Sequence, residues 1–342
     1  MYTLGIETSC DETACAVLEG GDRILANVIS SSLARHKPFG GVVPEIASRH
    51  CLEAIDLVYQ RALRKARIQP EQIDLIAVTR GPGLIGSIFV GVSFAKALSY
   101  ALNVPFVGVN HLEAHLEANF IGIKRPRTFI GLIVSGGHTS LVCVRSNRYQ
   151  LLGETVDDAI GEAYDKVAKI LGLGYPGGPI IDRLAQSGNG KEVSFTKPKQ
   201  DGPFDFSFSG IKTAVLNHYE RHQKKFLSEE YLKNFCAAFQ ETVMGWVVEK
   251  TMQACVAEGV PCVVVGGGVS ANSRLRQLLA RESRARGIRF FIPPFQLTTD
   301  NAAMVARLGY LLYKTGTRSD FGMIADPSLK IGASNGHLKR GH

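Results

Sequence analysis

The sequence predicts an α/β protein made of two similar lobes that face a central cleft, with helical insertions in the second lobe. Two observations lead to this prediction. The order of strand-like and helix-like segments recurs in the two halves, and each half has a glycine-rich loop between a buried strand and a helix. Strands that alternate with helices form layered α/β structures, because each element must bury an apolar face. The length of 342 residues suits about two domains.

The start of each half is rich in hairpins. Residues 4–30 read as strand, polar turn, strand, Gly-Gly-Asp turn and strand, and residues 129–155 repeat that order. Each half then adds a strand, glycines and a helix, at residues 75–98 and 262–279. Each closes with one more strand and helix, at residues 105–118 and 289–312. We therefore interpret the chain as an internal duplication.

The duplication sets the expected domain boundaries. We predict an N-terminal lobe over residues 1–128 and a C-terminal lobe over residues 129–325. The C-terminal lobe carries a helical insertion at about 183–258, and a basic tail follows over residues 326–342.

The composition is that of an ordinary globular protein, with 45% apolar and 20% charged residues. Seven irregularly spaced cysteines without a C-x-x-C pair fit a reduced, cytoplasmic chain better than a disulfide framework. We expect no signal peptide, no segment as long as a membrane span and no membrane partner. The net charge of +8, with basic runs such as residues 281–289, favours a polyanionic partner such as nucleic acid.

Two glycine loops invite a dinucleotide-binding interpretation. RGPGLIG (80–86) and GGGVSA (266–271) match that fingerprint, but neither is followed by the required acidic residue about twenty positions later. Tight packing of strand against helix explains the glycines of the first loop as well. We therefore do not expect NAD binding.

The segment IVSGGHTSL (133–141) is more informative. A strand, a Ser-Gly-Gly turn and another strand make a hairpin whose exposed amides can bind an anion. IETSCDET (6–13) occupies the same place in the first half. Two such hairpins around a polyphosphate, with a glycine loop near adenosine, are the layout of the actin, sugar-kinase and heat-shock ATPase superfamily.

Two histidines, His111 and His115, lie four residues apart in VNHLEAHLEA. On a helix they share a face and can bind one metal ion. The zinc-peptidase signature H-E-x-x-H would place glutamate directly after the first histidine, whereas Glu113 is one position later. Two structural histidines on a helix that faces the core remain the alternative.

Several motifs together resemble one family over nearly the whole chain. In order they are GIETSCDETACAV, GPGLIGSIFVG, NHLEAHLEA, LIVSGGHTSLV, GEAYDKVAKILGLGYPGGP, DFSFSGIKTAV, GGGVSANSRLR and TTDNAAM. They resemble the bacterial tRNA adenosine threonylcarbamoyltransferases, once classed as sialoglycoprotein endopeptidases. The resemblance implies acyl transfer from threonylcarbamoyl-AMP to the exocyclic amine of the adenosine 3′ of the anticodon, in tRNAs that read codons beginning with adenosine. AMP is the leaving group.

The resemblance also implies a metal centre between the two lobes. Its ligands would be His111, His115 and Asp300. This ligand set suits iron(II) and zinc, with iron(II) favoured, and leaves open positions on the ion. The metal would serve as Lewis acid and template rather than in redox chemistry.

The family's donor and adenine-nucleotide site maps onto the second half. The matching residues are Val134, Ser135, Gly136, Gly137, His138, Asp165, Gly178, Asp182 and Asn272. In the first half, Asp11 and Glu12 are our candidates for a general base or for a pair that orients the acceptor, since the attacking amine must lose a proton. A turn cap and an ion pair are the alternative roles for these two.

Partners follow from the resemblance as well: tRNA, a shorter inactive paralogue (TsaB-like) and a small P-loop ATPase (TsaE-like). An apolar face within residues 33–63 is a candidate paralogue interface. In the segment 197–214, the three phenylalanines either stack on RNA or pack into the core, and we favour the core. A small-molecule kinase on the same fold and a non-catalytic nucleotide-binding partner are the alternative functions.

Overall fold

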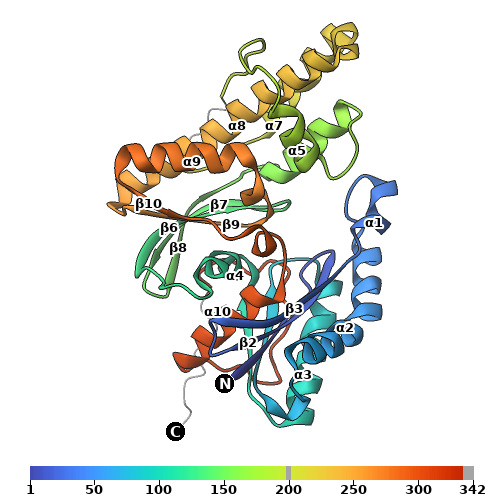
Figure 1. Cartoon of the computed structure of the whole chain (residues 1–342), viewed down its shortest axis with the longest axis vertical. Helices are drawn as coiled ribbons and strands as arrows, with labels where there is room; N and C mark the ends of the chain where they lie inside the picture. The colour runs from blue at the N-terminus through green and yellow to red at the C-terminus, as the bar shows by residue number, and fades with distance from the viewer. Residues whose placement is uncertain (198–201, 334–342) are drawn as a thin grey trace. The chain divides into compact units, whose positions relative to one another are not determined.

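The computed structural model describes residues 1–197 and 202–333, which form two compact units (Figure 1). Unit 1 joins Met1–Arg125 to the described residues from Thr299 onward, and unit 2 is Pro126–Thr298. The expected lobe over residues 129–325 thus differs from unit 2 at its C-terminal end, because the last helix packs on the sheet of unit 1. Much of the predicted basic tail, residues 334–342, lies outside the described residues.

Unit 1 is a five-stranded mixed sheet with helices on both faces. Its strands are β1 (Tyr2–Glu7), β2 (Glu12–Glu19), β3 (Arg23–Ser31), β4 (Ile73–Gly81) and β5 (Phe106–Asn110). Its α-helices are α1 (Leu33–His36), α2 (Pro44–Ala66), α3 (Ile85–Leu102), α4 (His111–Glu117) and α10 (Ala302–Lys314). Short 3₁₀ turns lie at Lys37–Phe39, Pro70–Gln72 and Ala118–Phe120.

Unit 2 has the same kind of sheet and more helices. Its strands are β6 (Thr128–Val134), β7 (Thr139–Arg145), β8 (Arg148–Glu154), β9 (Cys262–Gly266) and β10 (Arg289–Phe291). Its α-helices are α5 (Ile160–Ile170), α6 (Gly177–Ala185), α7 (Ser209–His222), α8 (Glu229–Glu258) and α9 (Ser273–Arg286). Its 3₁₀ turns lie at Gln223–Leu227, Gly268–Ala271 and Phe295–Leu297.

The two sheets confirm the predicted duplication. The strand order is β3-β2-β1-β4-β5 in unit 1, and β8-β7-β6-β9-β10 in unit 2. In each sheet the three strands of the hairpin-rich start are antiparallel, and the last two strands run parallel to the first. The predicted helical insertion corresponds to helices α5 to α8, which lie between β8 and β9 and begin earlier than expected.

Strand β1 separates two packed layers in unit 1. Leu4 and Ile6 are fully buried in an apolar cluster with residues of α2 and α3. Gly5 points to the opposite face, because side chains alternate along a strand. There a Cβ atom would lie 2.1 Å from the carbonyl oxygen of Ala302 in α10. Only glycine therefore lets α10 approach the sheet this closely.

The long helices carry the expected end signals. Helix α2 begins with Pro44, has Glu45 in its first turn and ends in a basic turn, which suits the helix dipole. Helix α8 begins after Ser228, whose side chain accepts a hydrogen bond from the amide of Tyr231. It ends at Gly259 in the left-handed conformation.

Helix α3 differs from one expectation. Among the described residues it is the one helix long and apolar enough to cross a membrane by length and composition, whereas we expected no such segment from the sequence. A core helix of a globular protein meets the same criterion. Helix α3 packs against β4 and α2, and a third of its residues are buried.

The glycine loop at residues 80–86 is closely packed, but at Gly83 it packs against the turn after β1 and not strand against helix as expected. A Cβ atom on Gly83 would lie 2.3 Å from the carbonyl oxygen of Ser9, and Gly83 has a φ of +150°. The glycine is needed because two backbone segments touch there. All seven cysteines are free, as expected.

The phenylalanine segment packs in the core of unit 2, as favoured above, although its residues 198–201 lie outside the described part of the chain. Phe206 and Phe208 are fully buried and stack on each other. Both contact the edge of Trp246 on α8. These two rings are therefore not available for stacking on RNA bases.

Asp157 ties the turn before α5 to the start of α7, which gives a stability prediction. Its carboxylate accepts hydrogen bonds from the amides of Phe208 and Ser209 and from the hydroxyl of Ser207. Partial burial raises the pKa of Asp157, but these hydrogen bonds outweigh it and hold the pKa below 3.8. Asp157→Asn should destabilise the fold by about 1–2 kcal/mol at pH 7.

The pH dependence follows from the sign of that shift. The contribution of Asp157 is complete above pH 3.8 and disappears as the pH falls through the folded-state pKa. Urea unfolding at pH 7 and at pH 3 should therefore show a smaller effect of Asp157→Asn in acid. Asp56→Asn on the exposed face of α2 is the control. An equal loss at both pH values would contradict the prediction.

Candidate functional site

The histidine pair lies where β5 passes into α4. Asn110 is the last residue of β5, and its side chain accepts hydrogen bonds from the amides of Leu112 and Glu113. This cap starts the helix at His111. All seven residues of α4 are buried, so both histidines are held in the interior of unit 1.

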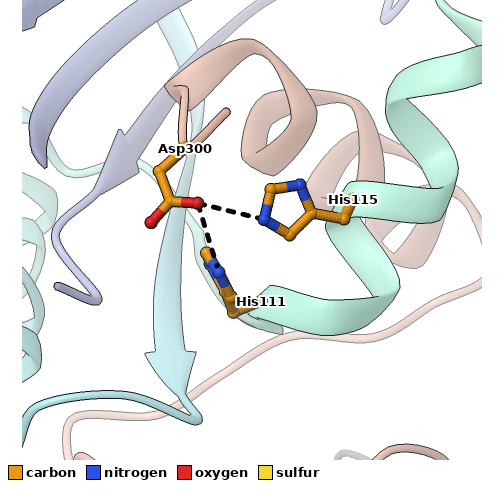
Figure 2. A group of neighbouring side chains, drawn as sticks. All are labelled: His111, His115 and Asp300. Atoms are coloured by element: carbon orange, nitrogen blue, oxygen red, sulfur yellow. Dashed lines mark hydrogen bonds and ion pairs between the residues drawn. The ribbon is translucent and has the colours of Figure 1, made fainter. Parts of the chain in front are cut away.

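Asp300 completes a cluster with the two histidines (Figure 2). Its Oδ1 lies 3.0 Å from Nε2 of His115 and 3.5 Å from Nε2 of His111. The two histidine side chains are 8% and 0% exposed, whereas that of Asp300 is 19% exposed. The two histidine side chains are therefore buried, and the carboxylate of Asp300 is the most solvent-accessible part of the cluster.

The ligands were expected to come from both lobes, and this expectation is wrong. His111, His115 and Asp300 all belong to unit 1. Asp300 immediately precedes Asn301, whose side chain caps α10, and α10 packs on β1 and β4. Asp300, just before the helix that ends the duplicated pattern of the second half, thus belongs to unit 1 and completes its cluster.

The three side chains fit a divalent metal ion. One ligand atom from each lies within 4.8 Å of the other two. Two ligands at about 2.1 Å from one ion are roughly 3.0–3.4 Å apart at octahedral or tetrahedral angles, which is close to the two nitrogen–oxygen distances above. Nitrogen and carboxylate ligands suit zinc and iron(II).

The other nitrogen of His111 has its own partners. Nδ1 lies 3.1 Å from Oε2 of Glu7 and 3.2 Å from Oγ of Ser9. Burial lowers the pKa of His111, but Glu7 and Asp300 outweigh it and raise the pKa to about 9. Burial likewise raises the pKa of Glu7, and His111 outweighs it, so the Glu7 carboxyl stays ionised. Metal binding at Nε2 must therefore displace a proton.

Glu113 does not face the cluster. Its Oε1 accepts a hydrogen bond from the amide of Gly332, at 2.9 Å. Burial is the main cause that raises the pKa of Glu113 to about 7. Since it points away from the histidine pair, Glu113 is not placed as the base of a zinc peptidase.

Asp11 and Glu12 lie at the start of β2, in the turn that follows β1. Oε1 of Glu12 accepts a hydrogen bond from the hydroxyl of Ser31, and the backbone carbonyl of Asp11 accepts one from Ser32. Burial first, and then Asp300 and Asp11, raise the pKa of Glu12 to about 10. Without a cation Glu12 is thus neutral, and a nearby divalent ion would favour its ionised form.

The predicted anion loop of unit 2 joins β6 to β7. The amide of Ser135 donates to the carbonyl of His138, which closes the hairpin after the buried Val134. Gly136 and Gly137 are exposed at its tip. The amide of Gly161, at the start of α5, donates to the carbonyl of Ser135. The loop is therefore held at both ends, with two glycine amides at its surface.

The predicted nucleoside residues of unit 2 meet at helix starts. Asp165 on α5 accepts a hydrogen bond from the amide of Gly177 at 2.7 Å, and its carboxylate also faces the amide of Gly178. Asp182 on α6 accepts from the amide and the hydroxyl of Ser273, the first residue of α9. These two carboxylates thus fasten the starts of α6 and α9.

Gln240, which sequence reasoning missed, connects this group. Its Nε2 donates to Asp182 at 3.0 Å, and its Oε1 accepts from Nδ2 of Asn272 at 2.7 Å. It is 3% exposed and lies on α8, far in sequence from both partners. Its one signal is an isolated amide in the apolar run CAAFQETVMGW. The structure thus links Asp182 and Asn272 through a helix that the motifs did not include, whereas Asp165 bonds to the amide of Gly177.

Known proteins resemble the chain over nearly its whole length. A family model described as tRNA N6-adenosine threonylcarbamoyltransferase matches residues 23–307. A relative of that description from Dictyoglomus turgidum is 50% identical over 334 residues, which are 97% of this chain and 99% of the relative. Another, from Symbiobacterium thermophilum, is 48% identical over 332 residues, which are 96% of both chains.

Solved structures resemble the fold. T. kodakarensis HypF has a TM-score of 0.62 at 14% identity, with 92% of this chain and 48% of HypF covered. Component A of (R)-2-hydroxyglutaryl-CoA dehydratase from Acidaminococcus fermentans has a TM-score of 0.53 at 16% identity, with 91% and 98% covered. At these identities the likeness concerns the fold alone. It agrees with the duplicated α/β architecture, so the predicted fold class of two similar α/β units with helical insertions in the second is confirmed.

Loss of a ligand should weaken metal binding. His115→Ala or Asp300→Ala should lower the affinity of the metal-free chain for Zn²⁺ by roughly 100-fold or more, because one of three protein ligands is removed. The measurement is Zn²⁺ titration by calorimetry, with the metal content of the purified chain alongside. Glu113→Gln, on the same helix but directed at Gly332, should bind like the wild type. Equal affinities in all four proteins would contradict the assignment.

Proposed function

Because the chain belongs to the tRNA N6-adenosine threonylcarbamoyltransferase family and is thus a tRNA-modifying transferase, we propose the following reaction for it. It transfers the threonylcarbamoyl group from threonylcarbamoyl-AMP to the exocyclic amine of the adenosine 3′ of the anticodon. The acceptors are tRNAs that read codons beginning with adenosine. A new carbon–nitrogen bond forms, the amine loses a proton, and AMP leaves with the electron pair of the broken anhydride bond.

The cluster of His111, His115 and Asp300 is the observation that supports this proposal most directly. Nε2 of each histidine and Oδ1 of Asp300 would hold a divalent ion, iron(II) in preference to zinc. When bound, the ion supplies positive charge that stabilises the oxyanion of an acyl-transfer transition state. The aspartate side of the cluster is its more exposed side, which is where a substrate carboxylate or phosphate could reach the open positions.

The remaining steps fall to residues of the chain itself. The exposed amides of Gly136 and Gly137, beside Ser135 and His138, would bind the phosphate of the donor. The adenosine would lie beside Val134, Gly178, Asp165, Asp182 and Asn272, and the two carboxylates would accept hydrogen bonds from ribose hydroxyls. Glu12, with Asp11, would accept the proton of the attacking amine once a cation keeps it ionised.

Exposed apolar side chains on α2 and α3 support the proposal of a protein partner. Leu52 on α2, and Ile85 and Phe89 on α3, are between 53% and 68% exposed, and the two helices pack together. This α2–α3 face extends the apolar stretch predicted within residues 33–63. Exposed apolar patches of this kind mark protein interfaces. We assign it to the shorter paralogue, and we keep tRNA, the P-loop ATPase and the cytoplasm as parts of the same proposal.

The reaction can be tested in cells depleted of their own enzyme of this class. Threonylcarbamoyladenosine, measured by nucleoside mass spectrometry of bulk tRNA, should return with the wild type and with Glu113→Gln. His111→Ala should fail to restore it, because losing several kcal/mol of charge stabilisation slows the reaction by roughly 100-fold or more. If the wild type does not restore the modification, the transferase proposal is wrong and the kinase alternative becomes the first to test.

The docking face makes a separate prediction. Leu52→Asp and Phe89→Asp should each weaken association with the co-expressed paralogue by roughly 10-fold or more, since a charge is then buried in an apolar interface. Co-purification and light scattering measure the complex. Leu227→Asp, at an 87% exposed position of unit 2, is the matched control. A complex of unchanged stability with both variants would exclude this face.

A further inference from the structure

A buried carboxylate stands directly behind the candidate metal cluster. Glu7 is the last residue of β1, is 0% exposed, and contacts Nδ1 of His111 on the side away from Asp300. We propose that Glu7 is the positioning residue that orients His111 toward the metal ion and leaves Nε2 free to bind it. The inference rests on the metal centre proposed above and concerns a residue outside its ligand set.

Glu7 is itself held on both sides. Its Oε1 accepts a hydrogen bond from the amide of Ser9 at 2.6 Å, and its Oε2 accepts one from the hydroxyl of Thr79 at 2.6 Å. Thr79 lies on β4, which pairs with β1 in the centre of the sheet. The carboxylate is thus attached to two neighbouring strands and has little freedom to rotate, as a support for a metal ligand requires.

The contact selects the histidine tautomer. A neutral imidazole carries one N–H, and an ionised carboxylate can only accept a hydrogen bond. With Oε2 of Glu7 3.1 Å from Nδ1, the proton belongs on Nδ1, where it is donated to Glu7. The lone pair is then on Nε2, the nitrogen that faces Asp300. A carboxylate behind a ligating histidine also makes that histidine a better electron donor to the ion.

Charge balance supports the same role. A buried carboxylate is costly unless an opposite charge lies near it. His111 supplies that charge only while it is protonated, and among the described residues no lysine, arginine or second histidine is paired with Glu7. A divalent ion with two neutral histidines, Asp300 and Glu7 has a net charge of zero. Glu7 thus suits a site that holds a dication.

The two histidines differ in this respect. Glu7 is not among the three residues whose ligand atoms cluster, so it acts behind His111 rather than as a fourth ligand. Within the described residues, Nδ1 of His115 is buried without a hydrogen-bond partner. Nδ1 of His111, by contrast, is held by Glu7, with Oγ of Ser9 as a second contact at 3.2 Å. Removal of the Glu7 charge should change the site through one ligand only.

The first measurement is Zn²⁺ affinity of the metal-free full chain, determined by competition with a chelator. Glu7→Gln keeps the size of the side chain but removes the charge. The NH2 group of the glutamine would also face one of the groups that donate hydrogen bonds to the Glu7 carboxylate. We expect a 10- to 100-fold weaker affinity, the usual effect of losing such a support. The absorption of bound Co²⁺ should shift as well, because the geometry at His111 relaxes. An affinity within twofold of the wild type would overturn the proposal.

A double-mutant cycle separates positioning from general damage. If Glu7 acts through His111, then Glu7→Gln should cause no further loss in a His111→Ala background, although it does so in the wild type. Equal losses in both backgrounds would mean that Glu7 only stabilises the fold. Glu117→Gln removes another fully buried carboxylate of unit 1, one paired with Arg125, and should leave Zn²⁺ affinity unchanged.

A milder variant covers the case in which Glu7→Gln does not fold. Thr79→Val removes the hydroxyl that holds Oε2 and keeps the carboxylate, so a loss of about 3- to 10-fold in Zn²⁺ affinity is expected. No change with Thr79→Val in that case would overturn the proposal. Wild-type protein that binds no Zn²⁺ would instead overturn the metal centre itself, and this inference with it.

Discussion

The close packing of α10 on the sheet of unit 1 is the constraint on which the candidate metal centre depends. Gly5 allows the backbone of Ala302 to come against β1, and Gly309 meets Ala77 of β4 in the same way. Asp300 lies just before this helix, so the packing of α10 sets how near its carboxylate comes to the histidine pair. Small residues at these contacts thus determine the geometry of a charged cluster that they do not touch.

The duplicated fold places polar groups at corresponding junctions of the two units. In unit 1 they follow β1 and β5, and in unit 2 they follow β6 and precede α9. The carboxyl ends of parallel strands are where α/β folds gather ligands. Yet the side chains at these junctions differ: unit 1 has the candidate metal cluster of two histidines and an aspartate, whereas unit 2 has exposed glycines, carboxylates and a buried glutamine. The same sheet architecture thus carries two different sets of side chains at its strand ends.

Much of this could be predicted from the sequence, because it depends on local patterns. Alternating apolar residues and Gly-containing turns predicted the antiparallel strands of both halves, and these were confirmed. The i, i+4 spacing of His111 and His115 requires only a helix, which Asn110 starts. Glu113 lies one position too late for the zinc-peptidase signature, which already argued against a peptidase. In the structure its carboxylate accepts a hydrogen bond from the amide of Gly332. The apolar alternation of Phe206 and Phe208 likewise favoured the core.

The sequence did not predict which distant segments contact each other, and only the tertiary structure shows these contacts. The repeat pattern assigned α10 to the second lobe, because hydrophobic periodicity shows which face of a helix is buried but not against which sheet. Glu7 and Gln240 were missed for a related reason: no local pattern marks either residue, because the partners of each lie far away in the sequence. Their partners, Thr79 and His111 for Glu7, and Asp182 and Asn272 for Gln240, are 32 to 104 positions away. Local composition determined the elements, whereas side-chain packing across those distances determined which polar groups meet.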